Sequence, residues 1–154
     1  TILTLLPLQE FPPPLRYVAS QALASLCIRD SNRLTTLLNI FKALSTHLSN
    51  KSVSSSAKVF ALTCVEAIYT RSGAEASHYA SMALDFLYDR TKSSQESQRM
   101  AAVNATAALV RGTGARVVEF ESDILRIIRM GMGDSRVPRV QIAAARLLKE
   151  LASV

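Results

Sequence analysis

The stretch that decides the fold lies at residues 99–109 and reads RMAAVNATAAL. A similar pattern occurs at residues 16–26 (RYVASQALASL), 58–68 (KVFALTCVEAI) and 141–151 (QIAAARLLKEL), so the pattern returns roughly every 42 residues. When the four stretches are aligned without gaps, the fourth column holds only alanine: Ala19, Ala61, Ala102 and Ala144. The last column holds only leucine or isoleucine. This agreement indicates an internal repeat, and a repeat of this length dictates the architecture of the whole chain.

A second set of apolar positions lies between these stretches and keeps the same spacing. Ile2, Leu44, Phe86 and Ile128 form one such column. Within residues 34–48, leucine and phenylalanine recur every three or four residues, which is the pattern of an amphipathic helix. No stretch shows the sustained two-residue alternation that is typical of strands. We therefore expect an all-α protein in which an outer helix, a short turn and an inner helix repeat about four times, over approximately residues 1–29, 30–73, 74–112 and 113–154.

Residues at the expected helix ends support this division. Ser93 and Glu96 have the spacing of a capping box ahead of the third inner helix. Gly73 and Gly112 stand where inner helices are expected to stop, because glycine commonly follows the last helical residue. Pro138 stands where an inner helix is expected to start, since proline is favoured in the first turn.

The repeat resembles the HEAT branch of the armadillo-like helical superfamily. The resemblance rests on two helices per unit, a period near 40 residues, and an inner-helix pattern of a basic residue, then Ala, then a small apolar residue, then Leu. The basic position is Arg16, Lys58 and Arg99 in the first three copies; the fourth has Gln141, with Arg139 close by. The resemblance covers the whole chain and implies a right-handed α-solenoid.

The sequence departs from the HEAT pattern at one position, and a second repeat type is an alternative. HEAT repeats favour an acidic residue a few positions before the basic one, and only Glu10 and Asp134 approach that pattern here. A three-helix armadillo repeat is the alternative, disfavoured because no separate short first helix is evident. In either case one helix pair cannot bury its own apolar face, so neighbouring pairs complete a continuous core.

Composition excludes several classes of protein. The chain has 154 residues, 49% of them hydrophobic, and a formal net charge of +6. This apolar content is too high for a disordered tail, and no apolar run reaches the roughly 20 residues that a membrane span requires. Two cysteines, Cys27 and Cys64, are too few for a disulfide framework. We expect an intracellular protein, cytoplasmic or nuclear, and an excerpt of a longer chain because the sequence opens on Thr1 within an apolar stretch.

Residues that could support catalysis or metal binding are few. His47 and His78 are far apart and have no carboxylate or thiol at ligand spacing, so we expect them at the surface or at helix ends. Cys64 shares a column with alanines, which predicts a small core residue. Asp85 and Asp89 share a helix face that we expect to be solvated. The sequence therefore predicts no enzyme, no cofactor, no metal and no small-molecule substrate.

Positive charge is the surface feature with the clearest functional meaning. Basic residues on stacked inner helices are expected to line a concave surface, and the candidate partner-binding residues are Arg16, Lys58, Arg99, Arg139 and Arg146. We expect a scaffold or adaptor module that binds a protein partner, either an acidic segment in this groove or neighbouring repeats at the apolar ends. The alternative is nucleic-acid or phosphate-backbone binding through the same surface. The same side chains could also serve only to solvate helix faces and bridge neighbouring repeats.

Overall fold

The prediction of an all-α fold is confirmed over the described residues. The computed structural model describes residues 33–134 and 136–154, and every regular element in these ranges is a helix. The α-helices are α3 (Arg33–Ser49), α4 (Ser55–Ala76), α5 (Ala80–Thr91), α6 (Glu96–Thr113), α7 (Glu121–Met132) and α8 (Pro138–Ala152). Two 3₁₀ segments, η1 (Ser77–Tyr79) and η2 (Gly114–Phe120), join α4 to α5 and α6 to α7. None of the described helices is long and apolar enough to cross a membrane.

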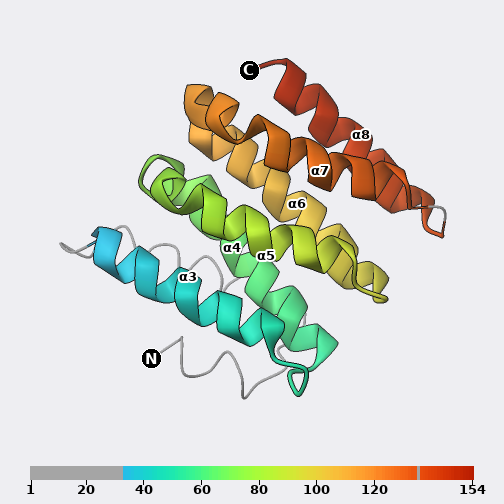
Figure 1. Ribbon diagram of the computed structural model, residues 1–154, viewed down its shortest axis with the longest axis horizontal. Helices are drawn as coiled ribbons and strands as arrows, with labels where there is room; N and C mark the ends of the chain where they lie inside the picture. Colours follow the sequence, from blue (N-terminus) through green and yellow to red (C-terminus); the bar gives the residue numbers. More distant parts are fainter. Residues whose placement is uncertain (1–32, 135) are drawn as a thin grey trace.

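The helices form two layers (Figure 1). α3, α5 and α7 lie side by side in one layer, and α4, α6 and α8 lie side by side in the other. Each helix of the first layer also packs against the helix that follows it in the chain, so α3 contacts α4, α5 contacts α6 and α7 contacts α8. We call α4, α6 and α8 the inner layer and α3, α5 and α7 the outer layer.

The repeated columns of the sequence form the core between the layers. Ala61, Ala102 and Ala144 are each fully buried, and their small side chains allow close approach of neighbouring helices. The small apolar column and the outer-helix column are also buried: Cys64, Ala105 and Leu147 in the inner layer, and Leu44, Phe86 and Ile128 in the outer layer. The three inner helices therefore present the same face to the core.

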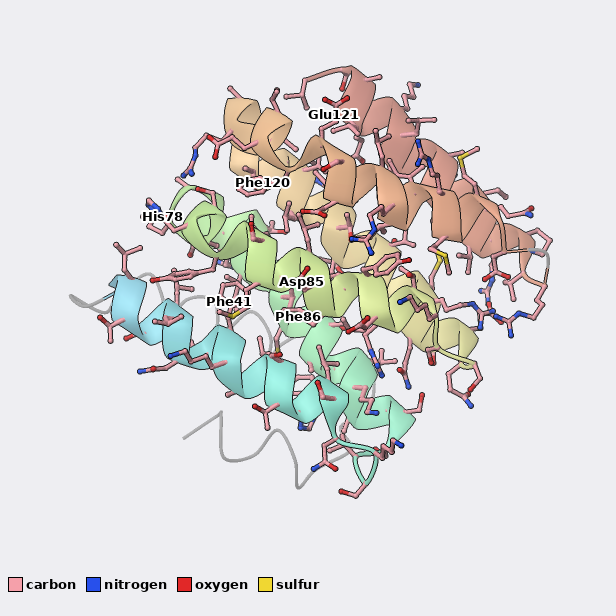
Figure 2. All side chains as sticks on the ribbon, viewed as in Figure 1. Phe41, His78, Asp85, Phe86, Phe120 and Glu121 are labelled. Carbon is pink, nitrogen blue, oxygen red and sulfur yellow. The ribbon has the colours of Figure 1, made fainter. Side chains whose placement is uncertain are left out.

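An aromatic cluster fills the space where α3, α5 and the end of α4 meet. The Phe41 ring centroid lies 5.9 Å from that of Tyr69, 6.0 Å from that of Tyr79 and 6.3 Å from that of Phe86. Figure 2 shows Phe41 and Phe86 close together between α3 and α5. These tilted contacts are the arrangement that aromatic quadrupoles favour. The Tyr69 hydroxyl donates to the Ala76 carbonyl oxygen at 3.1 Å, so this buried polar group is satisfied.

The expectation that helices stop at Gly73 and Gly112 is close but inexact at both positions. Gly73 lies inside α4, one residue after a kink at Ser72, where the backbone is non-helical (φ −134°, ψ 35°). α6 continues to Thr113, and its C-cap is Gly114 with φ +63°. A Cβ atom at Gly73 would overlap the Gly112 backbone, and one at Gly112 would overlap the Tyr69 carbonyl oxygen. These glycines let α4 and α6 touch backbone to backbone.

The expected helix starts are confirmed at one position and wrong at another. Pro138 is the first residue of α8, as predicted. The capping box of Ser93 and Glu96 does not form, because the N-cap of α6 is Gln95 and its side chain makes no capping hydrogen bond. The Ser93 hydroxyl instead accepts a hydrogen bond from the Gln95 amide at 3.1 Å, and Glu96 pairs with Arg139.

Candidate functional site

The five candidate partner-binding residues occupy different environments. Arg16 lies outside the described residues. Lys58 on α4 and Arg99 on α6 are buried, whereas Arg139 and Arg146 on α8 are exposed. Of the predicted set, the structure therefore brings two side chains to one exposed helix face.

Arg99 is a correction to the expected surface, because it lies in the interior with 3% of its surface exposed. Its Nε donates to Asp134 Oδ2 at 2.6 Å, and its Nη1 donates to the Ser93 and Ser94 carbonyl oxygens at 3.0 and 3.1 Å. The side chain thus joins the α5–α6 loop to the α7–α8 loop. A guanidinium held in this way is not free to contact a partner.

Lys58 departs from the expectation in a similar way, since only 9% of its surface is exposed. Burial, together with the charge of Arg90, lowers the pKa of its ammonium group. His47 lies at the end of α3, as one of the two expected placements, with 8% of its surface exposed, and its Nε2 lies 3.4 Å from the Ala57 carbonyl oxygen. The pKa of His47 lies below its ordinary value. Burial lowers it most, the hydrogen bond with the Ala57 carbonyl oxygen partly opposes this, and the charge of Lys58 lowers it further.

The exposed face of α8 carries both remaining arginines. Arg139, Ile142 and Arg146 are three and four residues apart, so they lie along one side of the helix. Ile142, which stands between these two cations in the sequence, is 52% exposed. Arg139 pairs with Glu96 of α6. Within the described part of the chain, Arg146 has no hydrogen bond or ion pair.

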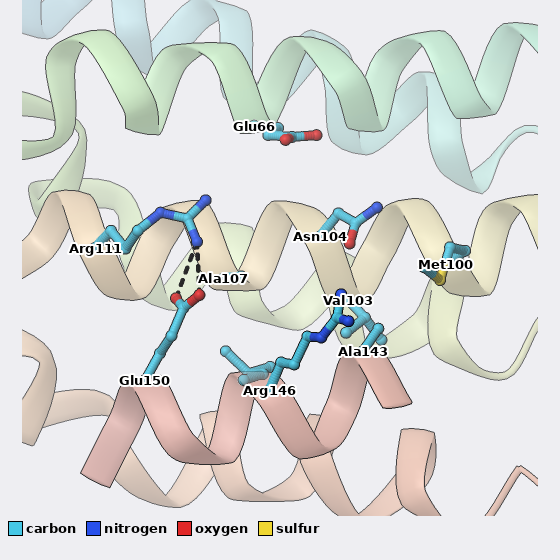
Figure 3. A pocket seen from close by; sticks show the side chains of 10 residues that line it. Glu66, Met100, Val103, Asn104, Ala107, Arg111, Ala143, Arg146 and Glu150 are labelled. Carbon is cyan, nitrogen blue, oxygen red and sulfur yellow. Dashed lines mark hydrogen bonds and ion pairs between the residues drawn. The ribbon is translucent and has the colours of Figure 1, made fainter. Parts of the chain in front are cut away.

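Two adjoining hollows lie over the inner layer. One, of about 140 Å³, opens between α4, α6 and α8 and is lined by Glu66, Asn104, Arg111, Arg146 and Glu150, among others (Figure 3). The other, of about 570 Å³, is lined toward the starts of the same helices by Val59, Thr63, Glu96, Met100 and Arg139, among others. Glu66, Met100 and Asn104 border both hollows, so the two form one groove across the helices. We call this the inner-face groove.

Charges in the inner-face groove are partly paired. Arg111 Nη1 donates to both carboxylate oxygens of Glu150, each at 2.9 Å. Figure 3 shows this pair bridging α6 and α8, with Glu66 across the groove on α4. Burial raises the pKa of the Glu66 carboxyl, and the charge of Arg111 partly opposes that rise. The groove therefore has an unpaired carboxylate on α4 and an unpaired guanidinium, Arg146, on α8.

An apolar row that the sequence-based prediction missed begins in the groove, which Val59 and Met100 line, and continues beyond its lining at Ile142 on α8. Val59, Met100 and Ile142 occupy the same column of the repeat on α4, α6 and α8. Val59 and Met100 are half-buried and Ile142 is exposed, so the row lies on the solvent side of the inner layer. The signal was present in the aligned stretches, whose second column reads Tyr, Val, Met and Ile although it follows a basic residue in three copies and Gln141 in the fourth. We call Val59, Met100 and Ile142 the apolar row.

The other residues weighed for chemistry occupy unremarkable positions. Cys64 is fully buried, as predicted, and Asp85 and Asp89 are exposed on α5. His78 is exposed in η1, at the edge of the outer layer (Figure 2). The described residues contain no group of three histidine, cysteine, aspartate or glutamate side chains that could hold a metal ion. At the chain end, Leu147 is buried, whereas Leu148 is 38% exposed and Val154 is 57% exposed.

Comparisons with known proteins give no relative for this chain. No protein-family model matches the sequence, and neither the curated proteins nor the solved structures contain a match. The functional assignment therefore depends on the residues of the inner-face groove themselves.

Proposed function

We propose that this chain is a HEAT-like α-solenoid segment that acts as a non-catalytic protein-interaction module inside the cell. Its ligand is an extended acidic segment of a partner protein, bound across the inner-face groove. The repeated columns and the two layers of helices support the solenoid assignment, because stacked helix pairs generate extended binding surfaces of this kind. Arg139 and Arg146 are the residues of the original set that we assign to the partner.

The observation that carries this proposal is the exposed Ile142 between Arg139 and Arg146, in line with Val59 and Met100. Apolar side chains that reach the surface together and are rimmed by polar groups are characteristic of interaction surfaces. The unpaired guanidinium of Arg146 favours a carboxylate on the ligand, because arginine binds carboxylates with two hydrogen bonds at once. The groove thus suits a ligand with both apolar and acidic side chains.

The spacing of the helices indicates how such a ligand lies. Neighbouring packed helices are separated by about 8–10 Å. A polyproline-like extended segment rises about 3.1 Å per residue with three residues per turn, so every third side chain points the same way about 9 Å further along. A segment of about seven residues with apolar side chains at every third position therefore places one on each member of the apolar row.

Binding of nucleic acid through the same surface is the weaker alternative. Glu66, Glu96 and Glu150 stand among the arginines of the groove, and carboxylates repel a phosphate backbone. The groove also has no aromatic side chain among its lining residues on which a base could stack. These features favour a peptide with separated charges over a uniform polyanion.

The proposal is tested with the 154-residue chain and fluorescein-labelled synthetic peptides, using fluorescence anisotropy. One peptide has leucine at every third position with glutamate and serine between, a second has the same composition with the leucines adjacent, and a third is oligoglutamate. A single-stranded oligonucleotide of equal length tests the alternative. We expect the first peptide to bind about tenfold more tightly than the other peptides and the oligonucleotide, and the Arg139→Glu, Arg146→Glu double variant to abolish this binding.

The matched control is the Lys42→Glu, Arg129→Glu double variant, which makes the same change of charge at exposed positions of α3 and α7 in the outer layer. It should bind the first peptide normally. Equal loss of affinity in both double variants would show a general charge effect and reject the groove. Tightest binding of the oligonucleotide, falling steeply with added salt, would instead establish the phosphate-backbone alternative.

A further inference from the structure

Three loop residues that precede inner helices make the same local turn. Asn50, Ser93 and Asp134 each follow an outer helix, and the side-chain oxygen of each accepts a hydrogen bond from the backbone amide two residues further along, at 2.9, 3.1 and 3.1 Å respectively. The three residues are therefore structural equivalents, one in each helix pair. They differ in charge, because only Asp134 carries a carboxylate.

The carboxylate of Asp134 forms an ion pair with Arg99, the basic residue of the preceding inner helix, α6. Arg99 Nε lies 2.6 Å from Asp134 Oδ2, and both side chains are buried. On α4 the residue equivalent to Arg99 is Lys58, and on the α5–α6 loop the residue equivalent to Asp134 is Ser93. The basic residue and the loop residue are separated by the same number of residues in the two cases, Lys58 to Ser93 and Arg99 to Asp134. Ser93 therefore occupies the position at which, by analogy with Asp134, a carboxylate would pair with Lys58.

Lys58 is a buried cation that lacks this partner. It is 9% exposed, and no carboxylate pairs with it among the described residues. The charge that acts on it most clearly is another cation, Arg90 on α5, whose Nη1 reaches only the Gln98 side-chain oxygen at 3.5 Å. Burying an ammonium group without an anion is unfavourable. α4, which carries Lys58, packs against α6 and also contacts α5.

Ser93 contacts Arg90 and Arg99 and is partly accessible. Its amide donates to the Arg90 carbonyl oxygen at 3.1 Å, and its own carbonyl oxygen accepts from Arg99 Nη1 at 3.0 Å. The residue is half-buried in the loop between α5 and α6, where neighbouring Ser94 is exposed. A dianionic group on the Ser93 hydroxyl would enter a region with cations on α4, α5 and α6.

We propose that Ser93 is a phosphorylation site, and that its phosphate takes the place that the Asp134 carboxylate holds in the next helix pair, pairing with Lys58 and Arg90. A protein kinase would transfer the γ-phosphoryl group of ATP: a bond forms between Ser93 Oγ and phosphorus, the bond from phosphorus to the ADP oxygen breaks, and the hydroxyl proton is released. The phosphate carries a charge of about −1.5 to −2 and three strong acceptor oxygens. It ties α4 to the α5–α6 loop, as Asp134 ties α6 to the α7–α8 loop.

The test uses the full chain with phosphoserine installed at position 93 by genetic encoding, with phosphoserine at the exposed neighbour Ser94 as the matched control. We expect the Tm of the Ser93-phosphorylated protein to rise by about 3 °C or more, and that of the Ser94-phosphorylated protein to change little. In the ³¹P NMR titration, the second pKa of the phosphate at position 93 should be lower than that at position 94, because cations favour the dianion.

The Lys58→Met variant identifies the partner. It should remove most of the rise in Tm at position 93 and return the phosphate pKa toward the value at position 94. Equal shifts at the two positions, no shift at position 93, or a shift that survives Lys58→Met would each overturn the proposal. Circular dichroism of every variant before melting confirms that the helices are intact.

Discussion

Arg99 and Asp134 form a buried ion pair that links two loops of different helix pairs. Their Nε and Oδ2 atoms are 2.6 Å apart, and 4% and 3% of their side chains are exposed. Asp134 Oδ1 also accepts the backbone amides of Arg136 and Val137 at 3.1 and 3.2 Å, just before α8 begins. One carboxylate therefore fixes both the position of α6 and the start of α8.

Removing one partner of this pair should be strongly destabilising. Asp134→Asn or Arg99→Met leaves the other group buried without its counter-charge, so each should lower the free energy of unfolding by about 3 kcal/mol or more. The double variant should cost less than the sum. Urea denaturation followed by circular dichroism measures this. Arg111→Met, which breaks the exposed pair with Glu150, is the control and should cost at most about 1 kcal/mol.

The same pair predicts how stability depends on pH. Burial alone would raise the pKa of Asp134, but the hydrogen bonds from Arg99 and from the Arg136 and Val137 amides, with the charge of Arg99, lower it below its ordinary value of 3.8. A lowered carboxyl pKa adds stability above the unfolded-state pKa, and this stability is lost as pH falls through the folded-state pKa. The difference in unfolding free energy between wild type and Asp134→Asn should therefore shrink below about pH 4. A difference that stays constant down to pH 2 would contradict the assignment.

Glu66 should have the opposite effect on stability. Its pKa is raised by burial, against the charge of Arg111, so the folded state holds its proton more tightly than the unfolded state does. That contribution favours folding below the unfolded-state pKa and is lost as pH rises through the folded-state pKa. Glu66→Gln should accordingly raise the urea midpoint at pH 7 and leave it nearly unchanged at pH 3, where both states are protonated. A lower midpoint at pH 7 would show that the carboxylate is paired in solution.

The backbone contact between α4 and α6 should not tolerate a methyl group. In Gly112→Ala the new Cβ would overlap the Tyr69 carbonyl oxygen, so the helices must separate. We expect a loss of about 1–3 kcal/mol, measured by thermal and urea unfolding, although alanine is the better helix former. Asn104→Ala on the exposed face of α6 is the control and should be neutral or slightly stabilising. A Gly112→Ala protein as stable as wild type would mean that the two backbones are further apart.

The aromatic cluster gives a prediction for the core. Phe41 is fully buried against three aromatic rings, and its truncation to alanine leaves a large cavity. Phe41→Ala should cost about 3–5 kcal/mol of unfolding free energy. Leu34→Ala at the exposed start of α3, where 46% of the side chain is exposed, should cost far less. Comparable losses in the two variants would place Phe41 outside the core.

The core could be predicted from the sequence because it is repeated. Ala61, Ala102 and Ala144 share a column and share full burial, since each occupies the same turn of an equivalent helix. The outer helix was located within two residues by its three- and four-residue spacing, although Leu34 within that pattern is exposed. Periodicity reports which face of a helix is apolar, and that was enough to place the helices.

The candidate site was predicted less well, because it depends on contacts between helix pairs. The sequence around Arg99 does not differ from that expected around an exposed arginine. Arg99 is buried by its contact with Asp134 in the α7–α8 loop, which is distant in the sequence. Gly73 could equally end a helix or allow two backbones to touch, and the sequence does not distinguish these roles. The apolar row was visible in the repeat, yet its exposure depends on which side of the inner layer faces solvent.

The contact between Gly73 and Gly112 is also a fulcrum, a fixed point about which α4 and α6 can tilt relative to each other. α4 and α6 touch backbone to backbone near their ends, whereas Val59 and Met100 border the larger hollow near their starts. Gly112 and Met100 are twelve residues apart on α6, a lever arm of about 18 Å. A tilt of a few degrees about the glycines therefore moves Met100 relative to Val59 by about 1 Å while the fulcrum stays in place. Small rotations there would change the width of the groove.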